Sequence, residues 1–328
     1  ACTYPSIAAH FGGTPVDGEL KIFAGSSNRR LAERIAHTLG RPLGEAVIDY
    51  FPDGEAHIQI QENVRGTDVF VVQSTCAPPD RNLMQLLIMI DALRRASAER
   101  VTALIPYFGY ARQEKKSTGR EPITAKLVAN ILEAAGASRI VTLDLHAPAV
   151  QGFFDIPVDH LLAAPLLADA VDRMGLENPV IVSPDAGGVP RAHDFSQRID
   201  GAPLAVVFKN RTAADQIEHL QIVGDVEGRD AIIVDDQIST GHTLVEASTA
   251  LLARGARSVS ACAVHPVFAG DAIEMLQDSS IGRLFVTDTI PIDSKIVNGK
   301  IQLVNTHDLF GEAVRRIHND ESVTALFK

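Results

Sequence analysis

The stretch Ile232-Ile233-Val234-Asp235-Asp236-Gln237-Ile238-Ser239-Thr240-Gly241-His242-Thr243 indicates both a fold class and a binding site. It predicts a buried apolar strand, two adjacent carboxylates, a loop of small residues and a helix that begins near Leu244. Open α/β sheets bind their ligands at the carboxyl ends of strands. The acidic pair at the end of an apolar strand therefore favours a ligand site over an ordinary acidic turn.

Two kinds of group in this stretch suit a sugar phosphate. Asp235 and Asp236 can accept hydrogen bonds from ribose hydroxyls. Residues 239–243 offer hydroxyls and the unpaired backbone N–H groups of a helix start, which together bind phosphate. The alternative for this loop alone is a simple helix cap, since Ser and Thr are favoured there.

The composition of the 328-residue chain excludes several classes of protein. Lys and Arg number 30 against 41 Asp and Glu, and the resulting net charge of -11 argues against general nucleic-acid binding. No apolar run approaches the ~20 residues of a membrane span. Cys2, Cys76 and Cys262 have neither metal-ligand spacing nor a disulfide pattern. Residues 1–18 lack the features of a secretory signal, so we expect a cytoplasmic protein.

Apolar strands alternate with helices from residue 20 onward, which predicts parallel sheets covered on both faces. We expect strands at residues 20–24, 69–73, 101–106, 140–145, 180–183, 204–208, 231–234, 259–264, 284–287 and 301–304. We expect helices at residues 28–39, 81–95, 123–135, 190–197, 244–254, 272–276 and 309–318.

The chain length predicts about two domains at roughly 150 residues each. The similar strand ends at residues 139–146 and 230–236 also suggest two comparable halves. We expect a poorly ordered N-terminal extension over residues 1–19, and a first domain over residues 20–163. We expect a second domain over residues 164–306. A terminal helix and tail over residues 307–328 should pack back on the first domain.

Polar side chains follow three other predicted strands. Arg112 lies beside Gln113 in an aromatic and cationic loop, where an arginine can stack on a purine or bind a phosphate. His146 and Asp185 can bind Mg²⁺ directly or through water, because this ion takes only one or two protein ligands. The alternative for each segment taken singly is a solvated loop or a structural side chain, and a lone histidine is more often structural.

Lys209 and Arg211 occupy alternate positions at the end of a further strand, so they point the same way if the strand continues. Two such cations can stabilise charge on a transferring phosphoryl group, although a solvated strand end is the alternative. Residues 51–55 contain Asp53-Gly54 and predict the tip of a hairpin. The chain has neither a P-loop nor a dinucleotide fingerprint, so an ATP site must be of another kind.

Taken together and in this order, these segments resemble the ribose-phosphate pyrophosphokinase family over residues 20–328. The resemblance is carried by Phe51–Glu55, Val64-Arg65-Gly66, Tyr110-Ala111-Arg112-Gln113, Arg120-Glu121-Pro122-Ile123, Asp144-Leu145-His146-Ala147, Gln151-Gly152-Phe153-Phe154, Ser183-Pro184-Asp185 and Ser322-Val323-Thr324-Ala325-Leu326-Phe327. It implies an α/β fold with two phosphoribosyltransferase-like domains, each a mainly parallel sheet flanked by helices.

The resemblance also implies a reaction. The anomeric hydroxyl of ribose 5-phosphate attacks the β-phosphorus of Mg·ATP, pyrophosphate is transferred, and AMP leaves. Asp235 and Asp236 would hold the ribose hydroxyls, and Ser239, Thr240, Gly241, His242 and Thr243 would surround the 5-phosphate. The product would be phosphoribosyl pyrophosphate, a precursor in nucleotide biosynthesis.

The remaining roles implied by the resemblance concern ATP and the metal. His146 and Asp185 would organise Mg²⁺, and Lys209 and Arg211 would stabilise the transition state. Arg112 and Gln113 would hold ATP. Phe51, Asp53 and Glu55 would contact adenine from a neighbouring subunit of a homo-oligomer, usually a hexamer built from dimers.

Two positions depart from the family pattern. Many members carry Asp where this chain has Ser239, and Gly where it has His242. The alternatives to an active synthetase are a phosphoribosyltransferase, which the acidic pair alone would also fit, and a non-catalytic regulatory relative. The presence of both cations and both metal-binding candidates favours the active enzyme.

Overall fold

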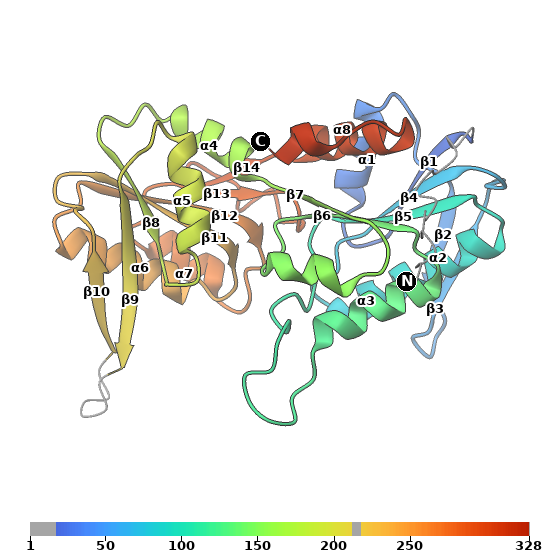
Figure 1. Ribbon diagram of the computed structural model, residues 1–328, viewed down its shortest axis with the longest axis horizontal. Helices are drawn as coiled ribbons and strands as arrows, with labels where there is room; N and C mark the ends of the chain where they lie inside the picture. Colours follow the sequence, from blue (N-terminus) through green and yellow to red (C-terminus); the bar gives the residue numbers. More distant parts are fainter. Residues whose placement is uncertain (1–17, 212–217, 328) are drawn as a thin grey trace, which may run out of the picture.

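The computed structural model describes residues 18–211 and 218–327, without the side chains of residues 209–211, 218, 219 and 327. The predicted N-terminal extension therefore lies outside the described residues up to residue 17. Two large sheets stand side by side along the molecule, each with helices on both faces (Figure 1). None of the helices in the described part of the chain is long and apolar enough to cross a membrane.

The first sheet is entirely parallel and has the strand order β1-β4-β5-β6-β7. Its strands are β1 (Leu20–Ala24), β4 (Asp68–Val72), β5 (Arg100–Ile105), β6 (Arg139–Leu143) and β7 (Val158–Leu161). Alternate residues of β1 face opposite cores, so that Ile22 packs with α1 (Arg29–Thr38) and Phe23 packs with α2 (Pro79–Arg95) and α3 (Thr124–Ala135). A short 3-10 helix, η1 (Pro148–Phe153), leads from β6 to β7.

The second sheet has seven strands in the order β10-β9-β8-β11-β12-β13-β14, and only the β9–β10 pair is antiparallel. The strands are β8 (Pro179–Ser183), β9 (Leu204–Arg211), β10 (Glu218–Val223), β11 (Asp230–Ile238), β12 (Ser258–Pro266), β13 (Leu284–Thr287) and β14 (Ile301–Val304). Helices α4 (Ala164–Asp172) and α5 (Val189–Arg198) cover one face. Helices α6 (His242–Ala253) and α7 (Ala272–Asp278) cover the other. The prediction of mainly parallel sheets flanked by helices is confirmed.

The strand that carries the acidic pair is longer than predicted. We expected the strand to end at residue 234 and the helix to begin near Leu244. Instead β11 pairs with β12 as far as Ile238, so Asp235 and Asp236 lie within the strand, and α6 begins at His242. The reason is that β12 is itself long enough to supply backbone partners beyond the carboxylates.

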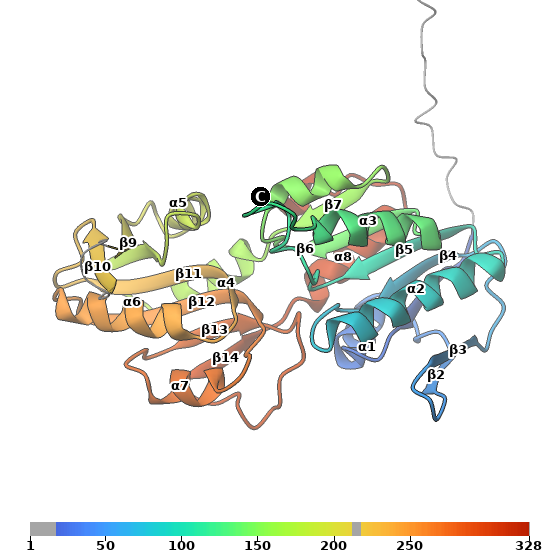
Figure 2. The ribbon, with the colours of Figure 1, turned by 90° about the horizontal axis from the view of Figure 1, so that it is seen from below.

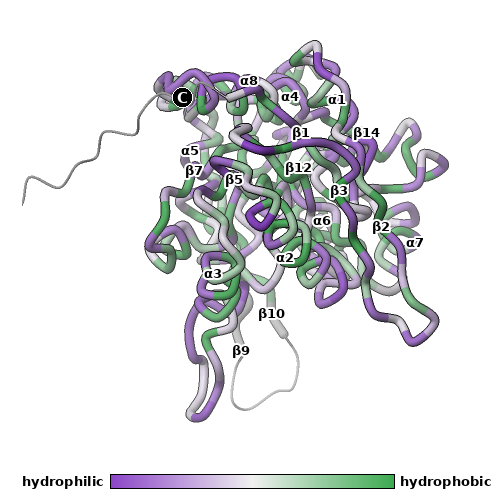
Figure 3. Tube along the Cα trace, turned by 90° about the vertical axis from the view of Figure 1, so that its right-hand side faces the viewer, coloured by the Kyte–Doolittle hydropathy of each residue, from purple (hydrophilic) through white to green (hydrophobic). Residues whose placement is uncertain are grey.

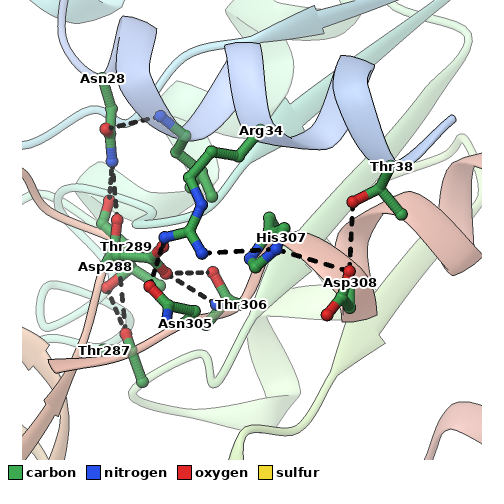
Figure 4. A network of polar contacts seen from close by, with 11 residues as sticks. Asn28, Arg34, Thr38, Thr287, Asp288, Thr289, Asn305, Thr306, His307 and Asp308 are labelled. Atoms are coloured by element: carbon green, nitrogen blue, oxygen red, sulfur yellow. Dashed lines mark hydrogen bonds and ion pairs between the residues drawn. The ribbon is translucent and has the colours of Figure 1, made fainter. Parts of the chain in front are cut away.

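A polar network joins the two sheets through α1 and the segment after β13 (Figure 4). Asn28, the N-cap of α1, donates from Nδ2 to the carbonyl of Asp288 at 2.8 Å. Arg34 forms an ion pair with the Asp288 carboxylate, at 3.6 Å. The last long helix, α8 (His307–His318), packs against α1, and Thr38 of α1 donates to Asp308. The chain ends in the short helix η2 (Thr324–Phe327).

The predicted hairpin is present as a separate antiparallel pair, β2 (Ala46–Tyr50) and β3 (Ala56–Ile60). In the view from below, this hairpin projects away from the first sheet, beneath α1 and α2 (Figure 2). The apolar stretches of the chain gather in the interior, whereas the projecting loops are largely hydrophilic (Figure 3). Phe51 is an exception, because it is 49% exposed at the tip of the hairpin.

Candidate functional site

A cavity of about 260 Å³ lies where the carboxyl ends of the two sheets face each other. The loop after β5 contributes Tyr107, Arg112 and Gln113, and the loop after β6 contributes His146. The second sheet contributes Asp236 and Gln237 from β11 and His265 from β12. Side chains from both halves of the chain therefore meet in one cavity, at the edge where open α/β sheets bind ligands.

The acidic pair is held by a cation and by a histidine from the other sheet. His146 Nδ1 donates to Asp236 Oδ2 at 2.7 Å. Arg191 Nη1 lies 3.5 Å from Asp235 Oδ1 and 3.4 Å from Asp236 Oδ1. The sequence did not single out Arg191. The feature that could have pointed to it is its position, because Arg191 is a cation in the first turn of the helix that follows the Asp185 loop.

The two carboxyls titrate as a pair and their pKa values move apart. Burial, with the adjacent Asp236 carboxyl as a second cause, raises the pKa of Asp235 above its usual range. Burial would also raise the pKa of Asp236, but the hydrogen bond from His146 and the charge of Arg191 hold it below its usual range. The same bond to Asp236 raises the pKa of His146 against the opposing effect of burial. Such a divided pair is typical of functional sites.

The predicted phosphate loop leads into α6, and no side chain caps the backbone N–H groups at the start of this helix. Gly241 is the N-cap of α6, has a left-handed φ of 83°, and makes no side-chain cap bond. A Cβ at Gly241 would also lie 3.3 Å from Leu276 Cγ, so glycine suits both the backbone and the space. Ser239 and Thr243 are half-buried, whereas Thr240 and His242 are exposed. The helix start therefore has the donors that an anion requires.

The loop after β8 is closed by its own aspartate. Asp185 Oδ1 accepts the N–H of Gly188 at 2.8 Å, and its carbonyl accepts from Ser183 Oγ at 2.7 Å. No hydrogen bond or ion pair joins Asp185 to His146 in the part of the chain that the structure describes. Nor do residues 18–211 and 218–327 contain three or more Cys, His, Asp or Glu side chains grouped to hold a metal ion. A metal here would rely on water and substrate oxygens.

Arg112 and Gln113 are brought to the cavity, as their position after β5 indicated. Gln113 accepts a hydrogen bond from Thr124 at the start of α3, which fixes its side chain. The rings of Tyr107 and His265 pack edge to face, with centroids 5.0 Å apart and an interplanar angle of 66°. Sequence reasoning gave no role to Tyr107, Gln237 or His265, because these residues of two sheets become neighbours only through the tertiary fold.

The residues that line this cavity do not include Asp185, Asp235 or residues 239–243. Two further groups of predicted residues are not placed in it. Phe51, Asp53 and Glu55 sit at the exposed hairpin tip and do not line it. Lys209 and Arg211 belong to β9 by their backbone, but their side chains lie outside the described residues. The roles suggested for all of the predicted site residues, these five included, stay predictions.

Comparison with known proteins identifies the family. A model of the N-terminal domain of ribose phosphate pyrophosphokinase matches residues 20–136, and a phosphoribosyl synthetase-associated domain matches residues 210–328. The curated ribose-phosphate pyrophosphokinase of Caldanaerobacter subterraneus subsp. tengcongensis is 52% identical over 309 residues, which cover 94% of this chain and 98% of the relative. That of Marinomonas sp. is 50% identical over 311 residues, covering 94% and 99%.

A solved structure agrees with these matches. The crystal structure of phosphoribosylpyrophosphate synthetase from Mycobacterium smegmatis superposes with a TM-score of 0.88 at 39% identity, covering 92% of this chain and 99% of that one. The identity and coverage of these relatives exceed what a shared fold alone would require. This chain belongs to the ribose-phosphate pyrophosphokinase family.

Proposed function

We propose that this protein is a ribose-phosphate diphosphokinase, which transfers pyrophosphate from Mg·ATP to the anomeric hydroxyl of ribose 5-phosphate. The products are phosphoribosyl pyrophosphate and AMP, and the enzyme acts in the cytoplasm. The observation that carries the proposal is the bond between His146 and Asp236, which brings the ends of both sheets into one cavity. A transfer between two substrates needs such a meeting point, because catalysis rests mainly on positioning them.

The two substrates divide between the two sheets. Asp235 and Asp236 accept the ribose hydroxyls, and residues 239–243 bind the 5-phosphate through the free donors at the start of α6. On the other side of the cavity, Arg112 and Gln113 hold the polyphosphate and base of ATP. This division explains why the cavity needs residues from both halves of the chain.

The donors near the cavity fit a magnesium ion. His146 uses Nδ1 for Asp236, which leaves its Nε2 for a ligand, and the side chain is 40% exposed. Asp185 is exposed at the end of β8 and offers carboxylate oxygen. When bound, the ion would neutralise phosphate charge and orient the transferred group. His146 and Asp185 would hold it together with water and phosphate oxygens, since Mg²⁺ needs few protein ligands.

The cations Lys209 and Arg211 complete the proposed site from β9. Charge spreads over the transferring group in the transition state, so cations that contact it there raise kcat more than they improve binding. A phosphoribosyltransferase would need the acidic pair and the phosphate loop but not a nucleotide side. The cavity residues after β5 and the family matches in both halves therefore favour the diphosphokinase.

The test is release of AMP from ATP by the purified protein, with and without ribose 5-phosphate and Mg²⁺. We expect AMP and phosphoribosyl pyrophosphate in equal amounts, only when both additions are present. Lys209→Ala should lower kcat far more than it raises either KM. Absence of ribose 5-phosphate-dependent AMP release would refute the proposed function, and a pure KM effect would refute the role of Lys209.

We also propose that the protein is a homo-oligomer, built from dimers and reaching a hexamer. Large apolar side chains are exposed on the hairpin and on α2 and α3: Val47, Phe51, Met84, Ile123 and Leu127. A subunit that covers them would also bring Phe51, Asp53 and Glu55 to a neighbouring ATP site. Light scattering on the purified protein tests this, and a monomer with full activity would contradict it.

A further inference from the structure

A single nitrogen of Arg191 bridges the two carboxylates that face the ribose. Nη1 lies 3.5 Å from Asp235 Oδ1 and 3.4 Å from Asp236 Oδ1. We propose that Arg191 is a positioning residue, which holds both carboxylates in the orientation that accepts the ribose hydroxyls. This inference rests on the proposed function, because the ribose itself is assigned to the acidic pair there.

The three side chains are partly or fully buried, which limits the screening of their attraction by solvent. Arg191 is 25% exposed, Asp235 19% and Asp236 only 6%. Charges partly removed from water are screened less than exposed ones, and a carboxylate buried without a partner is costly. Arg191 places a guanidinium within 4 Å of both carboxylates, and a guanidinium stays charged at every working pH.

The position of Arg191 is fixed from both sides. Its helix, α5, contacts β11, which carries the acidic pair, and also β8 and β9. The N-cap of α5 is Gly188, whose N–H is bound by Asp185 at 2.8 Å. A Cβ at Gly188 would lie 2.8 Å from Ser183 Oγ, which donates to the Asp185 carbonyl, so a side chain here would disturb the loop. The backbone at the start of the helix that carries Arg191 is therefore held in place.

The bridging geometry differs from an ordinary arginine–carboxylate pair. A bidentate pair has N–O distances of about 2.7–2.9 Å and uses both oxygens of one carboxylate. Here the contacts are longer, and they take one oxygen from each of two carboxylates. Asp236 gives its other oxygen, Oδ2, to His146. Arg191 thus sets the spacing of the pair without saturating either carboxylate.

The experiment compares Arg191→Met, Arg191→Lys and the control Arg198→Met in steady-state assays of the full-length enzyme. Losing the charged contact should raise the KM for ribose 5-phosphate by about tenfold to a hundredfold. The KM for ATP should stay within about twofold of that of the unmodified enzyme, because Arg191 is expected to affect only the ribose 5-phosphate side of the site. The Arg191→Lys variant keeps one positive charge at this position, so an increase of about threefold is expected.

Arg198 is a matched control because it lies on the same helix and forms a local ion pair with Asp194 at 3.2 Å. Its substitution should leave both KM values unchanged. Should Arg191→Met fail to fold, the Arg191→Lys variant carries the test, with thermal melting as the check on its fold. Equal increases in the KM for ATP and for ribose 5-phosphate would overturn a positioning role.

A double-mutant cycle with Asp235→Asn separates this inference from the proposed function. If Arg191 acts through the carboxylates, the effect of Arg191→Met should shrink once Asp235 is replaced. Additive effects, or a normal KM for ribose 5-phosphate in both Arg191 variants, would overturn the inference. If Asp235→Asn itself left that KM unchanged, the assignment of the ribose would fail instead.

Discussion

The ends of β6 and β11 look alike in the sequence but use their aspartates for opposite purposes. Asp144 follows the last residue of β6 and turns inward with a left-handed φ of 40°. Its carboxylate accepts the N–H of Ala163 at 2.6 Å and is 9% exposed as a residue. Asp235 and Asp236 instead stay in the extended backbone of β11 and contact Arg191 and His146.

The cause of this difference is the length of the neighbouring strands. β6 ends together with its partners, and after Leu143 the chain is free to turn. β11 continues beside β12 as far as Ile238, so the backbone stays extended through both carboxylates. An apolar strand followed by aspartate therefore does not by itself determine where the strand ends. Whether the carboxylate binds a ligand or the backbone depends on the next strand.

Among the substitutions considered, replacing Asp236 should lower activity most. A small loss would contradict the contrast between a ligand-binding aspartate in β11 and a structural aspartate after β6. Asp236→Ala removes the bond to His146 and the contact with Arg191. We expect kcat/KM for ribose 5-phosphate to fall on the order of a thousandfold, because two charge-assisted contacts are lost. Asp225→Ala, which removes an exposed pair with Arg229, is the control. A loss below about tenfold would contradict a direct role.

Replacing Asp144 should instead affect stability. Asp144→Ala leaves the N–H of Ala163 without an acceptor and puts alanine at a left-handed φ. We expect the free energy of unfolding to fall by about 2–4 kcal/mol, measured by urea denaturation. Asp144→Asn keeps an acceptor and tolerates this φ, so a loss of at most about 1 kcal/mol is expected. Equal stability of the two variants would show that Asp144 does not hold the backbone.

The sequence predicted most of the strands and helices because their apolar periodicity is strong. It missed β7 and β10, whose alternation is broken by polar residues such as Asp159, His160 and Glu218. It also missed α4, which begins with Ala164 and Pro165 in a region interpreted as a domain boundary. Short edge elements and an abrupt helix start carry too little local signal to be predicted.

The sequence could point to candidate site residues that directly follow a single strand. It could not predict contacts between residues that distant segments bring together. The acidic pair, the phosphate loop and Arg112 each stand next to a strand in the sequence. The bond between His146 and Asp236 joins residues 90 positions apart, and Arg191 lies 44 positions before Asp235. Such contacts depend on how the two sheets face each other, which no local pattern encodes.

A half-buried histidine makes the segment after β6 sensitive to acid. His160 of β7 accepts the N–H of Leu145 at Nε2, at 2.8 Å, so this nitrogen must be unprotonated. Burial lowers the pKa of His160 to about 4, below its ordinary 6.5. Between these values the unfolded chain binds more protons, so stability falls as the pH is lowered. From about pH 7.5 to about pH 5 this amounts to about 2 kcal/mol.

The variant His160→Gln tests this, because its amide oxygen can still accept from Leu145 but does not titrate. Between about pH 7.5 and about pH 5, we expect the unfolding free energy of this variant to fall by about 2 kcal/mol less than that of the unmodified protein. Urea denaturation at about pH 7.5, 6.5 and 5 measures it. Parallel curves for the two proteins would mean that His160 does not resist protonation in the folded state. The remaining acid sensitivity would then belong to other buried groups, such as His265.

The smallest effect is expected at His242, in the predicted phosphate loop. His242 is the first residue of α6 and its side chain is exposed, while the required backbone conformation is supplied by Gly241. His242→Gly should therefore change the KM for ribose 5-phosphate by less than about threefold. Glycine in the helix should lower stability by roughly 0.5–1 kcal/mol. A large change in KM in either direction would mean that the imidazole reaches the phosphate. The β11 end would then bind its ligand with a side chain as well as with the backbone.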